Sequence, residues 1–432
     1  MRKSTLFALL LSGAGQLAFT QTPAPKLTLK EAEALALKNH PQILAAQSEI
    51  GYANQQVTEN RSAYYPTVEA DITGSVANRE SRIGAGYLTD SRLFNREGQG
   101  ITVSQLITDV GRTSNLVASS RFNAQASEQN LQSARYVVLL QVNRSYIDVL
   151  HAVSLVRVAE ETVAARQLLS DQVSALAKNN LRSQLDVSFA DVNVSEAKLL
   201  LLRAQDSVQE AYAELSLALG SDQVVNYQLV DDPLPPSPPA KADDLVAQAF
   251  TYRPELASLR LSREAAYKFV EAEKDLARPN VSLVGVAGYI PYIAQLTSQA
   301  IPSEYGGAAV NVEIPVFNGH LFSARREAAR YHAIEADQNL RKQQERVARD
   351  VRVAWASAMT AYQSIDVTAQ FLRQASLALD LAQGRYNLGL SSIVELTQAQ
   401  LNVTQAEIEN LSAKYDYQSQ YSTLQYAIGL LR

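Results

Sequence analysis

Two intervals of the chain show the alternation of apolar and polar residues that is typical of β-strands. Residues 67–76 carry apolar residues at the even positions and polar residues at the odd ones, and residues 310–314 repeat this pattern. A period of two gives a strand one apolar and one polar face. We therefore expect the strands of the protein to lie within residues 66–110 and 279–318, with two strands in each interval.

Outside these intervals, apolar residues recur at a spacing of three and four, which predicts amphipathic helices. The helical pattern begins after Gly111 and after Gly319, which we interpret as turns from strand to helix. It predicts antiparallel hairpins over residues 112–219 and 320–430. A helix over residues 112–177 would be about 100 Å long at ~1.5 Å per residue, and no single domain of this size can bury such a rod along its whole length. We expect these helices to pack against other subunits as well.

The order of these elements is repeated along the chain. Pro41 and Pro66 recur as Pro254 and Pro279, 213 positions later in both cases. Further identities lie 209 positions apart, namely Asn130 and Asn339, Leu131 and Leu340, Val142 and Val351, Leu181 and Leu390, Asn193 and Asn402, Ala197 and Ala406, and Gly220 and Gly429. Matches in the same order along both halves predict two tandem structural repeats, each built from a long helical hairpin and two strands.

A proline-rich segment separates the two repeats, and an export signal precedes them. Five prolines between residues 231 and 240 exclude a helix or a central strand there. Residues 1–20 start with two cations, continue with a short apolar stretch and end in small residues, as secretory signal peptides do. A frayed N-terminal helix is the alternative. We expect a signal peptide over 1–20, a first repeat over 21–230, a linker over 231–240 and a second repeat over 241–432.

Composition and charge narrow the functional classes. The chain has no cysteine, which excludes a disulfide framework and a cysteine nucleophile. Its formal net charge of −5, without a basic tract, argues against nucleic acid as a partner. The 4 histidines form no His-Glu-x-x-His motif, and residues 84–86 (Gly-Ala-Gly) lack the setting of a phosphate-binding loop and fit an extracellular loop better. We expect a non-enzymatic, mostly α protein with a small β part, without a catalytic site, cofactor or metal.

Four strands per chain cannot form a complete membrane structure. So few strands do not close a barrel, and an open sheet edge that faces lipid leaves its backbone groups without partners. Tyrosine and phenylalanine residues flank both intervals, as in the aromatic girdles of outer-membrane barrels, although ordinary packing would also explain them. We expect other copies of the chain to complete the barrel. The main alternative is a periplasmic coiled-coil adaptor or scaffold without a pore, against which the duplicated alternating intervals argue.

Several local motifs resemble those of the TolC family of outer-membrane efflux proteins. They are the two repeat openings at residues 34–41 (ALALKNHP) and 249–256 (AFTYRPEL), the turn Gly111-Arg112-Thr113, and the second tip at residues 385–389 (RYNLG) and 393–396 (IVEL). Each motif is weak alone, but their order, spacing and duplication extend over the whole mature chain.

The resemblance implies a homotrimer in the outer membrane with helices that extend into the periplasm. Each chain would contribute four strands to a trimeric 12-stranded β-barrel, and the helices would form a periplasmic α-barrel. A periplasmic adaptor and an inner-membrane pump would dock at its inner end. Substrate would then pass through the lumen of a tripartite efflux or type I secretion system without any chemistry.

Two acidic residues lie just inside the returning helices at the tips of the hairpins. Asp186 and Glu395 are equivalents in the two repeats, and helix capping is the simpler interpretation of both. The resemblance implies that Tyr386 and Asp186 belong to a gate of polar links that closes the periplasmic entrance. A basic residue that joins such links in some relatives corresponds to Ser391 here, so we expect that arm of the gate to be absent. The resemblance also assigns Glu395 to a carboxylate ring at the entrance; one turn later this chain has Gln398, so we expect a ring of three charges.

Overall fold

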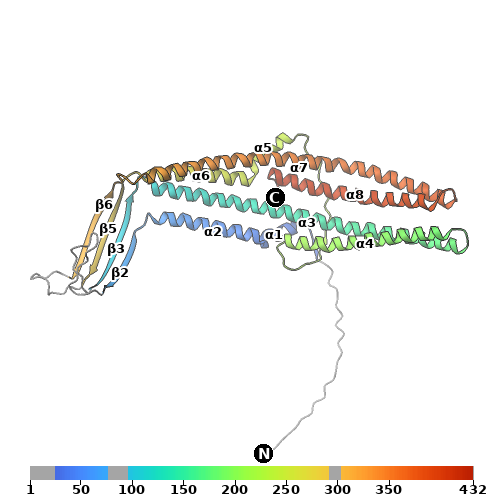
Figure 1. Ribbon diagram of the computed structural model, residues 1–432, viewed down its shortest axis with the longest axis horizontal. Helices are drawn as coiled ribbons and strands as arrows, with labels where there is room; N and C mark the ends of the chain where they lie inside the picture. Colours follow the sequence, from blue (N-terminus) through green and yellow to red (C-terminus); the bar gives the residue numbers. More distant parts are fainter. Residues whose placement is uncertain (1–24, 76–95, 291–302, 432) are drawn as a thin grey trace, which may run out of the picture.

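Long antiparallel helices dominate the computed structural model, which describes residues 25–75, 96–290 and 303–431 (Figure 1). The helices are α1 (Leu29–Asn39), α2 (Pro41–Ser62), α3 (Arg112–Lys178), α4 (Gln184–Ala218), α5 (Ala242–Tyr252), α6 (Pro254–Asp275), α7 (Leu321–Asn387) and α8 (Ile393–Ile428). The strands are β1 (Lys26–Leu27), β2 (Thr67–Ser75), β3 (Arg96–Thr108), β4 (Gln228–Leu229), β5 (Asn280–Tyr289) and β6 (Glu304–Glu313). The expected fold class, mostly α with a small β part, is confirmed.

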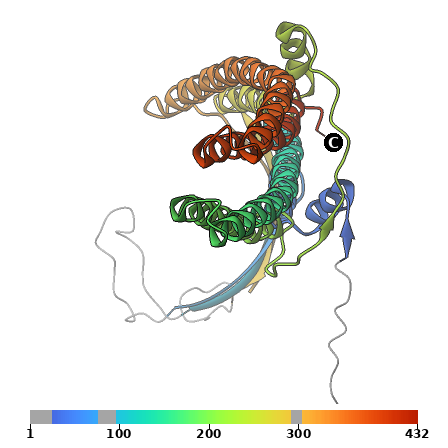
Figure 2. The same cartoon turned by 90° about the vertical axis from the view of Figure 1, so that its right-hand side faces the viewer.

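The helices of the second half match those of the first in order and in length. Helices α3 and α7 each have 67 residues, and α4 and α8 have 35 and 36. Helix α6 packs against both α3 and α7, and each long helix packs against its returning partner. Seen along their length, the helices form a curved layer that is open on one side (Figure 2). Such a layer leaves helix faces uncovered within one chain.

Local capping sets where several helices begin. Thr28 and Glu31 form a capping box at the start of α1, in which the Thr28 backbone N–H donates to the Glu31 carboxylate at 2.8 Å. His40 ends α1 and also caps α2, because its Nδ1 accepts the Gln42 N–H at 3.2 Å. Proline at the first position of α2 has no N–H to satisfy, so the break between the two helices is encoded locally.

Four strands form an antiparallel sheet at one end of the helices, in the order β2-β3-β5-β6 (Figure 1). The two halves of the chain meet in this sheet through the pairing of β3 with β5. One face carries exposed apolar side chains, with Ile72 85%, Val310 68% and Val312 54% accessible to solvent. Both outer strands, β2 and β6, have one edge without a partner among the described residues.

The linker between the halves lies on the helices as an extended segment, and the strand just before the linker, β4, pairs with β1. Strands β1 and β4 form a short parallel pair that the sequence pattern did not predict. The Tyr146 hydroxyl accepts the Val230 N–H at 3.0 Å and lies 2.8 Å from the carbonyl oxygen of Leu27. The Trp355 indole N–H donates to the Pro239 carbonyl at 2.7 Å. Aromatic side chains on the long helices thus hold the chain at both ends of the linker, at Val230 and at Pro239.

Three sequence expectations fall outside the described residues. They are the signal peptide over 1–20, the loop at residues 84–86, and the aromatic residues Tyr87, Phe94 and Tyr292. In the part of the chain that the structure describes, none of the helices has the length and apolar character that a membrane-spanning helix needs.

Candidate functional site

The two hairpin tips pack on each other at the end of the molecule opposite the sheet (Figure 1). Leu169, Val173 and Ala190 of the first hairpin share one apolar cluster with residues of the second, namely Ala382, Tyr386, Ile393, Leu396 and Ala399. The packing brings the acidic and aromatic residues singled out in the sequence into one region.

Tyr386 lies within this cluster and contacts an arginine from the other tip. Its side chain is only 3% exposed. The guanidinium of Arg182 stacks on the Tyr386 ring at 4.1 Å from the ring centre, and its Nη2 donates to the Tyr386 carbonyl at 2.8 Å. This stacking is a cation–π contact. Burial raises the pKa of the Tyr386 hydroxyl; the Arg182 charge opposes that rise and the Asp186 charge adds to it.

Asp186 acts as a helix cap within the chain. Its carboxylate accepts the Ser183 N–H at 3.1 Å, and its own N–H donates to the Ser183 hydroxyl at 3.1 Å. The Tyr386 hydroxyl is buried and has no hydrogen-bond partner among the described residues. The structure brings both residues to the tip without a direct bond between them, so their role in a gate stays a prediction.

Glu395 lies in the first turn of α8 and is paired with a cation. Its N–H donates to the Ser392 hydroxyl at 3.4 Å, and its Oε1 lies 3.2 Å from Nε of Arg385. Both side chains of this ion pair are about half exposed, 57% for Arg385 and 47% for Glu395. An ion pair so open to water is weak, but it places a positive charge directly beside the expected carboxylate ring.

Sequence reasoning missed both arginines at the tips. Arg182 occupies the position in the first half that Ser391 occupies in the second, because 182 + 209 = 391. The structure nevertheless places a basic residue, Arg182, on Tyr386, and this residue comes from the opposite repeat. The offset of 209 could have pointed to it. Arg385 belongs to the motif at residues 385–389. It lies about one helical turn before the tip and Glu395 lies about one turn after it, so the two could have been expected to face each other.

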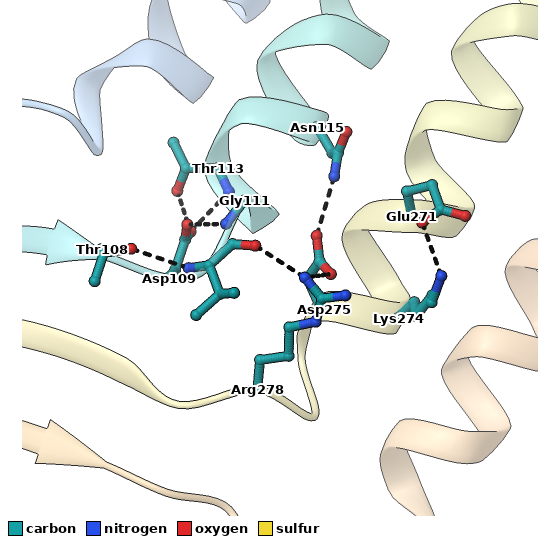
Figure 3. A network of polar contacts seen from close by, with 10 residues as sticks. Thr108, Asp109, Gly111, Thr113, Asn115, Glu271, Lys274, Asp275 and Arg278 are labelled. Carbon is teal, nitrogen blue, oxygen red and sulfur yellow. Dashed lines mark hydrogen bonds and ion pairs between the residues drawn. The ribbon is translucent and has the colours of Figure 1, made fainter.

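The turn at Gly111 is a second polar site, at the junction of strand and helix (Figure 3). Gly111 has a φ of +110°, a conformation that side chains rarely adopt. The Asp109 carboxylate accepts the Gly111 N–H at 3.2 Å, the Thr113 N–H at 2.7 Å and the Thr113 hydroxyl at 2.6 Å. The turn at Gly319 has a φ of +62°, and it is followed by His320 at +68° without a side-chain cap.

A buried carboxylate joins this turn to the second half of the chain. Asp275, at the end of α6, is 4% exposed; it accepts the Asn115 amide at 3.0 Å and pairs with Arg278 at 3.1 Å. Arg278 also donates to the Val110 carbonyl at 3.2 Å (Figure 3). The network ties the entry into α3 to the entry into β5, so it fixes how the sheet meets the helices.

Replacement of Arg278 with alanine should destabilise the protein by about 1–3 kcal/mol per chain, because it leaves the buried Asp275 carboxylate without its counter-ion. The matched control is Lys274→Ala, which breaks an ion pair with Glu271 whose two side chains are both 50% exposed. Such a pair contributes only about 0–1 kcal/mol. Thermal unfolding in detergent measures both variants, and equal midpoints would contradict the assigned role of Arg278.

The described residues show no group of three or more histidines, aspartates or glutamates that could hold a metal ion. The carboxylates of Asp109 and Asp186 accept backbone N–H groups where helices begin. Their contacts are suited to holding helices and strands in fixed relative positions.

The comparisons with known proteins agree on one family. The sequence profile described as "Outer membrane efflux protein" matches residues 34–221 and 245–430. The outer membrane efflux protein BepC of Brucella suis is 24% identical over 417 residues, which cover 95% of this chain and 86% of BepC. The outer membrane protein TolC of Escherichia coli K12 is 20% identical over 406 residues, covering 91% of this chain and 80% of TolC.

A solved structure extends the likeness to the fold. The Campylobacter jejuni CmeC outer membrane channel has a TM-score of 0.79 to this chain at 19% identity, covering 93% of this chain and 85% of CmeC. The resemblance inferred from the motifs is confirmed by the profile, which covers most of the sequence. The chain belongs to the outer membrane efflux protein family.

Proposed function

We propose that the protein is the outer-membrane channel of a tripartite efflux or type I secretion system and conducts substrate passively. The observation that carries this proposal is a four-stranded sheet, apolar on one face and open at both edges, that continues directly into long helices. Family membership makes it an outer-membrane protein with periplasmic helices. In the proposed arrangement, substrate passes from the helical end to the sheet end.

The open edges and the uncovered helices support a trimer. Three copies of the four strands would close a barrel of 3 × 4 = 12 strands and leave no edge exposed to lipid. The same threefold arrangement would close the curved layer of helices into a periplasmic α-barrel. The mature chain in this proposal starts after residue 20 and has repeats over 21–230 and 241–432, joined by the linker 231–240.

The tips are the proposed docking end for a periplasmic adaptor and an inner-membrane pump. They are also the proposed gate, in which Tyr386 and Asp186 restrict the entrance and Glu395 forms a ring of carboxylates. What supports the gate is the contact of the two tips across Arg182 and Tyr386. An opening that separates the hairpins must break that contact.

Size measurement in detergent and conductance in planar bilayers test this function together. We expect a detergent-stable trimer that conducts ions across a bilayer. A stable monomer that is soluble without detergent would contradict the proposal and would instead fit a periplasmic scaffold.

Replacement of Glu395 with glutamine should reduce the preference of the channel for cations, because acidic rings concentrate cations at narrow entrances. The structure suggests a matched variant whose effect on cation preference should be the opposite. Arg385→Gln removes the cation that lies 3.2 Å from the Glu395 carboxylate, so it should increase cation preference. Reversal potentials in a salt gradient measure both variants. An unchanged reversal potential in Glu395→Gln would show that Glu395 acts only as a first-turn carboxylate of α8.

A further inference from the structure

Tyr305 lies on the polar face of the sheet, in a row that contains two glycines. The strand register pairs Tyr305 of β6 with Gly288 of β5, Gly288 with Gly100 of β3, and Gly100 with Asp71 of β2. Residues paired across an antiparallel sheet point to the same face. Ile72, the neighbour of Asp71, belongs to the opposite, apolar face. In the proposed barrel, the row with Tyr305 therefore faces the lumen.

The Tyr305 ring crosses two neighbouring strands in place of their missing side chains. A methyl group added at Gly288 would overlap with Cζ and the hydroxyl oxygen of Tyr305, and also with the backbone carbonyl oxygen of Gln99. One added at Gly100 would overlap with the same hydroxyl oxygen. The ring consequently lies flat along the sheet, and Tyr305 keeps 43% of its surface exposed. Glycine weakens a strand interior by about 0.5–1 kcal/mol relative to alanine, and close approach by another group accounts for its use at such positions.

Tyr305 also lies at the far end of the sheet. It is the second residue of β6, which runs from Glu304 to Glu313 before the chain turns into α7. The end of the sheet where β6 begins is therefore the end away from the helices (Figure 1). In the proposed trimer, three such rings would surround the lumen near its outer opening.

We propose that Tyr305 lines the exit of the channel, and that Gly100 and Gly288 set the width of the exit by letting the ring lie against the wall. This inference rests on the proposed function. A side chain at Gly100 would turn the ring toward the axis and narrow the passage for large solutes. The exposed ring faces also give substrates an aromatic surface at the point where they leave the channel.

A cysteine reporter tests the width of the exit without depending on the periplasmic gate. The chain has no native cysteine, so Asn311→Cys can be labelled alone in intact cells. Asn311 shares the face of Tyr305 and lies 311 − 305 = 6 residues deeper, about 20 Å at ~3.4 Å per residue. The reagents are a small and a bulky maleimide, both unable to cross membranes and both added from outside.

The variant that narrows the exit is Gly100→Ala. In that variant only the tyrosine hydroxyl overlaps with the new methyl group, while the next atoms, the Ala287 carbonyl oxygen and Tyr305 Cζ, lie at an ordinary 3.5 Å. We expect slower labelling of Asn311→Cys by the bulky reagent and an unchanged rate with the small one. Adding Tyr305→Phe removes the hydroxyl and should restore the rate. Gly307→Ala is the matched control, because its methyl group points to the same face and meets only Val286 Cγ2 at 3.9 Å.

A second variant keeps the inference testable if Gly100→Ala fails to assemble. Tyr305→Ala, in the presence of both glycines, removes the ring and should speed labelling by the bulky reagent. Equal rates in Gly100→Ala and Gly307→Ala, or an unchanged rate in Tyr305→Ala, would overturn the role of Tyr305. A different result would contradict the proposed channel itself: the small reagent would then label Asn311→Cys no faster than Val312→Cys on the apolar face.

Discussion

Replacement of Ile72 with arginine should prevent most of the protein from assembling in the outer membrane. Ile72 is 85% exposed on the apolar face of the sheet and lies inside β2. An arginine that faces lipid near the middle of a bilayer costs about 2–4 kcal/mol on a barrel. In the proposed trimer the cost recurs three times, about 6–12 kcal/mol, which is as large as the whole stability of a typical domain, ~5–15 kcal/mol.

Val312→Arg should have a smaller effect of the same kind. Val312 is on the same face but only one residue from the end of β6, where the cost of a cation falls toward zero at the membrane surface. Thr73→Arg is the matched control, because it adds the same charge next to Ile72 on the polar face. The amount of trimer in outer-membrane fractions, before and after heating, measures all three. Equal losses for Ile72→Arg and Thr73→Arg would mean that the apolar face does not contact lipid.

Local patterns predicted the elements of this fold closely. The hairpin expected over 112–219 appears as α3 and α4, which span Arg112–Lys178 and Gln184–Ala218. Periodicity and capping residues act over a few positions, so they can be read directly from neighbouring residues. The alternating residues 67–76 likewise became β2, which spans Thr67–Ser75.

The contacts that decide the candidate sites were not predictable in this way. Arg182 and Tyr386 are 204 residues apart, and Asn115 and Asp275 are 160 apart. Such pairs meet only because long helices pack along their length, and a shift of one helical turn would separate them. The family resemblance matched the basic gate residue to Ser391 of the second repeat. Arg182 was missed because it lies at the equivalent position of the first repeat.

The same contact leads to the second large expected effect, on the resting state of the proposed channel. Arg182→Gln should raise the resting conductance, because the guanidinium joins the two tips through the Tyr386 ring and carbonyl. A cation–π contact contributes about 0.5–2 kcal/mol, and a hydrogen bond from a charged donor about 1.5–3 kcal/mol. Repeated three times in a trimer, the loss would shift a closed–open equilibrium by several kcal/mol.

The variants Tyr386→Phe and Asp186→Asn separate the parts of the proposed gate. Each should raise resting conductance in planar bilayers and the uptake of vancomycin by cells, but less than Arg182→Gln. Tyr386→Phe keeps the stacked ring and loses only a hydroxyl that has no partner within the described chain; any effect it has therefore reports a bond made to a neighbouring subunit. Asp186→Asn removes a charge near Arg182 and Tyr386 while leaving an oxygen to cap α4.

If Arg182 and Tyr386 act through one contact, the variant that combines Arg182→Gln with Tyr386→Ala should open the channel no more than the stronger single variant. Wild-type conductance in Arg182→Gln would exclude the contact from the gate, and the closed state would then depend on the apolar cluster around Leu396 and Ile393.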